Sequence, residues 1–147
     1  MYMEHISSEQ LEMVSLEQLV PKGHSYRKYL ELLNFKHLTT ELRKKENEYT
    51  KGATGYGMET LFKCLLLQIM ENLSDRELEK ALQENLYMKY FCGFSITSKT
   101  PTYSLFSRVR DRIGTHRLSK LFIRVRKSLQ MPCGKSVMQL LRRKWKS

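Results

Sequence analysis

Three arginines at alternating positions, Arg108, Arg110 and Arg112, lie in a short stretch that also contains Ser104 and Ser107. On a helix, Arg108 and Arg112 share a face because they are four residues apart, whereas Arg110 lies nearer the boundary with the apolar face. Guanidinium and hydroxyl groups bind phosphate oxygens, and arginine also binds guanine edges through two hydrogen bonds. The stretch therefore indicates either a DNA-binding face or a solvated helix face, and the residues alone do not decide between them.

A second candidate is a pair of amphipathic helices, expected over residues 58–71 and 74–84 and joined by a short turn. This spacing is typical of a helix-turn-helix, in which the second helix presents side chains to the major groove. Here the second helix would present Arg76 and Lys80, but also glutamates, so it is not strongly basic. From spacing alone, an ordinary antiparallel helix pair is the favoured interpretation.

No motif for nucleophilic, phosphoryl-transfer or metalloprotease chemistry is present. The only aspartates, Asp75 and Asp111, lie in basic helical segments and do not form the carboxylate cluster that divalent ions require. The three cysteines and four histidines are scattered, which argues against a disulfide framework and a zinc site. We therefore expect no catalytic residues, no metal and no cofactor.

The chain carries 26 basic and 15 acidic residues, for a net charge of +11. A surplus of this size suits a polyanion, because each neutralised phosphate releases a counterion. The segment 131–147 has five basic residues and no acidic one, and it is predicted to be a basic tail without a specific function. No apolar run approaches the roughly 18 residues that span a bilayer, and no signal peptide is visible, so a cytoplasmic protein is expected.

Apolar residues recur at helical spacing along most of the chain, and no strand pattern appears. Ser74 followed by Glu77 predicts a capped helix start, and Gly114 predicts a helix end. A polar, glycine-containing stretch over residues 44–57 is expected to be a loop. The fold class is therefore predicted as all-α, a small multi-helix domain with a helix-turn-helix-like core.

Five ordered motifs resemble the N-terminal domain of insertion-sequence transposases of the InsH type. They are SLEQLVP (15–21), LFKCLLLQ (61–68), LSDRELE (73–79), NLYMKYFCGF (85–94) and PTYSLFSRVRDRIG (101–114). The sequence departs from the family at Thr102, where an aspartate is usual, although threonine can also cap a helix. The resemblance covers about residues 13–130.

The resemblance implies a DNA-binding domain that, in the family, precedes a nuclease domain with three carboxylates and two Mg²⁺ ions. Since the sequence leaves the family pattern near Gln130, we expect a domain over residues 1–130 followed by a divergent tail, 131–147. That tail is hypothesised to be a frameshifted remnant. The protein is thus expected to be truncated before the nuclease domain and inactive alone.

The implied partner is DNA, the terminal inverted repeats of the element, with a homo-oligomer or a heterodimer with full-length transposase as further possibilities. Two alternatives stay open at this point. One is a small helix-turn-helix regulator of transcription, and the other is a helical protein-interaction module. The candidate DNA-binding residues are Arg76, Lys80, Ser104, Ser107, Arg108, Arg110 and Arg112.

Overall fold

The computed structural model describes residues 15–40, 42 and 55–129, and in this part every regular element is a helix and none is a strand. The helices are α2 (Leu16–Leu19), α3 (Ser25–Leu32), α4 (Phe35–Leu38), α6 (Met58–Met70), α7 (Asp75–Glu84), α8 (Leu86–Cys92), α9 (Tyr103–Ile113) and α10 (Thr115–Leu129). The all-α prediction is confirmed. Within these ranges, no helix is long and apolar enough to cross a bilayer.

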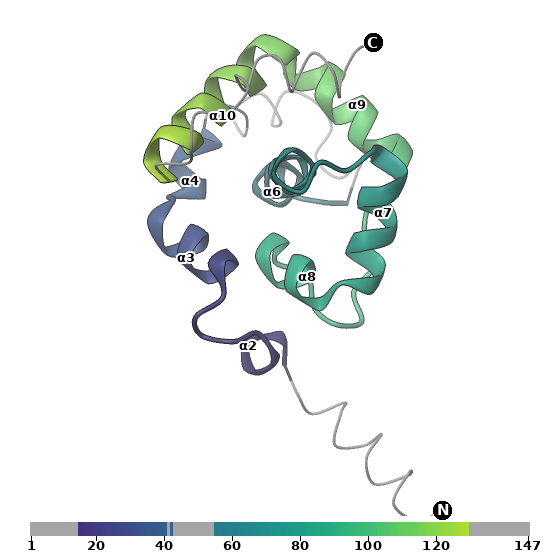
Figure 1. Cartoon of the computed structure of the whole chain (residues 1–147). Coiled ribbons are helices and arrows are strands. Elements are labelled where there is room, and N and C mark those ends of the chain that lie inside the picture. Colours follow the sequence, from purple (N-terminus) through teal and green to yellow (C-terminus); the bar gives the residue numbers. More distant parts are fainter. Residues whose placement is uncertain (1–14, 41, 43–54, 130–147) are drawn as a thin grey trace, which may run out of the picture.

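Helix α6 occupies the centre of the molecule, and α3, α4, α10, α9, α7 and α8 are arranged around it (Figure 1). Its sequence explains this position, because apolar side chains cover more than one of its faces. Leu61, Leu65, Leu66 and Leu67 are all buried, and so is the polar side chain of Gln68. Helix α6 is therefore the central helix of the described fold.

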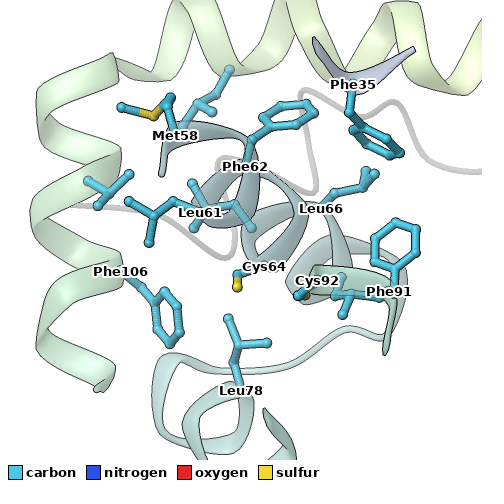
Figure 2. Packing of buried hydrophobic residues seen from close by; sticks show 14 of the residues in the cluster. Phe35, Met58, Leu61, Phe62, Cys64, Leu66, Leu78, Phe91, Cys92 and Phe106 are labelled. Atoms are coloured by element: carbon cyan, nitrogen blue, oxygen red, sulfur yellow. The ribbon is translucent and has the colours of Figure 1, made fainter. Parts of the chain in front are cut away.

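Aromatic side chains join the surrounding helices to α6 (Figure 2). The ring of Phe62 stacks on that of Phe122 from α10, with centroids 5.4 Å apart. On the α7 and α9 side, Leu78 and Phe106 point toward α6 near Cys64, whose thiol is free and buried. Such close packing resists relative rotation of the helices, so the outward faces of α7 and α9 are fixed as well.

The helix ends follow local sequence signals. The hydroxyl of Ser74 accepts a hydrogen bond from the Glu77 backbone N–H, and the Glu77 carboxylate accepts one from Ser74, which confirms the predicted capping box. Gly114, with φ +90°, separates α9 from α10 as predicted, because a residue with a Cβ would be strained there. The next helix, α10, begins at Thr115, directly after this glycine.

Several predictions concern residues that the structure does not describe. Most of the predicted loop over 44–57 and the whole basic tail, 131–147, fall outside the described ranges. The frameshift hypothesis for the tail therefore stays a hypothesis.

Candidate nucleic-acid interface

Arg110 joins α9 to both α7 and α6 through a polar network. Its guanidinium donates to the two carboxylate oxygens of Asp75, at 2.6 Å to Oδ1 and 2.8 Å to Oδ2. Gln68 completes the network, because its Nε2 donates to Asp75 Oδ1 at 2.7 Å while its Oε1 accepts from Arg110 at 3.3 Å. The Arg110 side chain is only 13% exposed, so this predicted DNA contact lies mostly inside the protein.

Two further contacts from α7 hold the first turn of α9. The Glu79 carboxylate accepts a hydrogen bond from the Tyr103 backbone N–H at 2.7 Å. The guanidinium of Arg76 lies over the Tyr103 ring, 4.5 Å from its centroid. Thr102 is the N-cap residue of α9, yet its side chain makes no capping hydrogen bond, so the carboxylate of Glu79 performs that role from another helix.

The outer face of α9 carries most of the predicted DNA-binding side chains. Ser104, Ser107, Arg108 and Arg112 are all exposed, whereas Leu105, Phe106, Val109 and Ile113 are buried beneath them. Ser104, Arg108 and Arg112 follow one another at intervals of four residues and so lie along one line of the helix surface. Lys80 is also exposed, on the neighbouring helix α7.

The charge of α7 differs from that of the two helices that follow α8. Residues 75–84 contain two basic and four acidic residues, whereas residues 103–129 contain eight basic residues and only one acidic residue, Asp111. A phosphate backbone is therefore attracted to the α9 side more strongly than to α7. Arg76 lies on the side of α7 nearest to the start of α9, because its guanidinium covers the Tyr103 ring, and Lys80 follows it one helical turn later.

Reasoning from sequence missed three features of this region. It missed the Glu79 contact with α9, which depends on how two helices meet. It missed Lys99, in the connector before α9, which lines a cavity together with Arg108. It also missed a line of exposed basic residues on α10, namely Lys120, Arg124 and Lys127, although their spacing of four and three residues was a readable signal.

In the part of the chain that the structure describes, no cluster of three or more histidine, cysteine or acidic side chains is arranged to hold a metal ion. The side chains on the exposed face of α9 are mostly cations and hydroxyls, while the carboxylates of Asp75 and Glu79 bond to α9 itself. The chemistry of the cations and hydroxyls suits the binding of phosphate and nucleobases.

Comparison with known families gives a single finding. Residues 14–112, about two-thirds of the chain, match the family described as "Transposase domain (DUF772)". The match includes α7, α9 and the connector between α8 and α9. No curated protein and no solved structure matches the chain.

Proposed function

Since the chain belongs to this transposase domain family, we propose that it is the DNA-binding N-terminal part of an insertion-sequence transposase of the InsH type. The observation that carries the proposal is the line of Ser104, Arg108 and Arg112 on the exposed face of α9. Serine hydroxyls and guanidinium groups at this spacing suit contacts with successive phosphates or with guanine edges. The expected ligand is the terminal inverted repeat of the element.

Arg110 has a positioning role in this proposal rather than a direct one. Its guanidinium is engaged by Asp75 and Gln68, so it sets the rotation of α9 about its own axis. That rotation determines where Arg108 and Arg112 lie. Arg76 and Lys80 contribute from α7, at the margin of the bound DNA.

The test is DNA binding measured by fluorescence anisotropy over a range of salt concentrations. Duplexes from the two ends of the element are compared with shuffled duplexes of equal length. Arg108→Ala and Arg112→Ala should each weaken binding and reduce the slope of log K against log salt by about 1. Lys28→Ala is the matched control, because Lys28 is exposed on α3, across α6 from α9 (Figure 1).

Two results would contradict the proposal. Equal affinity for end and shuffled duplexes would exclude specific binding. Unchanged slopes in both arginine variants would exclude the α9 face as the contact surface.

The protein in this proposal binds DNA without cleaving it. Asp75 is engaged by Arg110 and Gln68, and Asp111 lies exposed on α9, so these two aspartates do not converge on a common ion. Incubation with Mg²⁺ and a supercoiled plasmid that carries both ends should leave the plasmid intact. Nicking by the purified protein would contradict this part of the proposal.

We expect the protein to act in the cytoplasm. Because an insertion sequence has two ends, we also expect it to act as a homo-oligomer or together with a full-length transposase. Light scattering of the complex with end DNA should give a mass with at least two protein copies. A complex with one copy per duplex at saturation would exclude the homo-oligomer.

A further inference from the structure

A cavity of about 500 Å³ lies beside the start of α9. Tyr56 lines it from the segment before α6, Lys99 and Thr100 line it from the connector after α8, and the first turns of α9 contribute Thr102, Leu105 and Arg108. Its volume falls within the range of small-molecule sites in proteins. It is therefore larger than one phosphate group and has room for the attached nucleotide.

The walls of this cavity are fixed by contacts on the protein side. The hydroxyl of Tyr56 donates to the backbone carbonyl of Lys99 at 3.2 Å. The Tyr56 ring lies edge-on to that of Phe94, with centroids 6.0 Å apart, and Leu105 is buried at the base of α9. A site held in this way does not have to be ordered by its ligand, which lowers the free-energy cost of binding.

The lining is cationic and rich in hydroxyl groups. Lys99 and Arg108 supply two positive charges, Thr100 and Thr102 supply hydroxyls, and none of the described lining residues is acidic. The nearby carboxylate of Glu79 bonds to the Tyr103 N–H and is not part of the lining. Two cations with adjacent hydroxyl donors form a typical environment for phosphate oxygens.

We propose that this cavity binds a backbone phosphate of the DNA, with Lys99 and Arg108 as the two cations. The inference rests on the proposed function, because Arg108 also belongs to the exposed line on α9. It goes further by adding a contact from the connector, Lys99, and by placing one nucleotide in a recess instead of on a flat surface.

Lys99→Ala is the variant that tests the cavity. It should reduce the salt slope of binding to end DNA by about 1, whereas Lys99→Arg should keep the slope. Lys28→Ala again serves as the control. Because Lys99 is exposed, the melting temperature of the variants should stay at the value of the parent protein.

Thr100→Asp tests the same cavity with a negative charge. Thr100 lies in the connector before α9 and is partly exposed, so the variant should keep the melting temperature of the parent protein. The new carboxylate would line the cavity and repel phosphate, so the affinity for DNA should fall roughly tenfold. Unchanged affinity in both Lys99→Ala and Thr100→Asp would overturn the proposal.

Amide chemical shifts distinguish the source of the phosphate. Titration with a duplex from the element end should move the amide signals of Lys99, Thr100 and Thr102. Equal shifts with thymidine monophosphate at millimolar concentration would overturn the assignment to backbone DNA and identify a free-nucleotide site. No shift with either ligand would exclude a phosphate site.

The two proposals fail in different ways. If Arg112→Ala weakens DNA binding and Lys99→Ala does not, the cavity is excluded while the DNA-binding function stands. If no duplex binds but thymidine monophosphate shifts the cavity amides, the DNA-binding function is excluded and the cavity is a site for free nucleotides.

Discussion

The junction of α6, α7 and α9 and the corner formed by α2, α3 and α8 are each built on one nearly buried arginine. Arg110 and Arg27 have similar side-chain exposures, 13% and 12%. Their partners differ, because the Arg110 guanidinium bonds to the side chains of Asp75 and Gln68, whereas that of Arg27 bonds to the backbone carbonyls of residues 17, 20 and 21 as well as to side chains.

The difference shows two uses of the same side chain. The Arg110 network requires particular residues on three helices, so it specifies how these helices are rotated against one another. The Arg27 guanidinium instead bonds to the backbone of residues 17–21, which precede α3. It also lies over the Tyr90 ring, 4.8 Å from its centroid, so it connects residues 17–21 to α8. The junction of α6, α7 and α9 supports the proposed DNA-binding face, whereas the corner of α2, α3 and α8 holds the N-terminal part of the described residues in place.

Arg110→Ala should have the largest effect on stability. It removes the hydrogen bonds from the Arg110 guanidinium to the Asp75 carboxylate and to Gln68 Oε1, which costs roughly 2–3 kcal/mol for a hydrogen-bonded charge. Chemical denaturation should show this loss, and DNA affinity should fall although Arg110 is not a direct contact. If Asp75→Ala, Arg110→Ala and the double variant show additive losses, the coupling between the two residues is absent.

Ser74→Ala should cause the next largest loss of stability. The variant removes the hydroxyl that caps α7 immediately before Asp75, which costs about 1 kcal/mol. Ser74→Asp is the matched control, because aspartate caps a helix equally well and should retain the stability. A full loss of stability in the control would mean that the serine acts through some contact other than the cap.

Arg27→Ala should lower the melting temperature less than Arg110→Ala, because its acidic partner Glu17 is 67% exposed and screened by water. Its effect should be local, so amide hydrogen exchange should accelerate in residues 15–20 and remain slow in α9. Uniform acceleration across all helices would show that the two arginines are equivalent.

Glu17→Gln should have the smallest effect on stability. The hydrogen bond from Arg27 holds the pKa of Glu17 below its ordinary value of 4.5. A carboxyl whose pKa is lowered by folding contributes stability above its unfolded pKa, and this contribution is lost as pH falls through the folded pKa. The melting temperature of Glu17→Gln should therefore lie slightly lower than that of the parent at pH 7, and the difference should vanish at acidic pH, once Glu17 is protonated in the folded state as well. An equal melting temperature at every pH would exclude the ion pair as a source of stability.

Local sequence signals were sufficient for the helices but not for the way in which they meet. Apolar spacing identified α6 through α10, and Ser74 and Gly114 marked their ends, because these signals act over only a few residues. The bond between Arg110 and Asp75 joins residues 35 apart in the chain and depends on the rotation of both helices. Lys99 was missed for the same reason, since its cavity forms only where two stretches far apart in the chain, residues 55–56 and 99–108, meet.

The arrangement of helices around α6 also has a mechanical consequence. Helix α10 contacts α3, so the ring around α6 closes through a contact between an early helix and the last helix of the described residues (Figure 1). Because these helices are far apart in the sequence, their contact costs more loop-closure entropy than the pairs of α6 with α7 and α8, and we expect it to form after them. A pulling force applied to α3 and α10 should therefore separate these two helices while α6 still holds α7, α8 and α9.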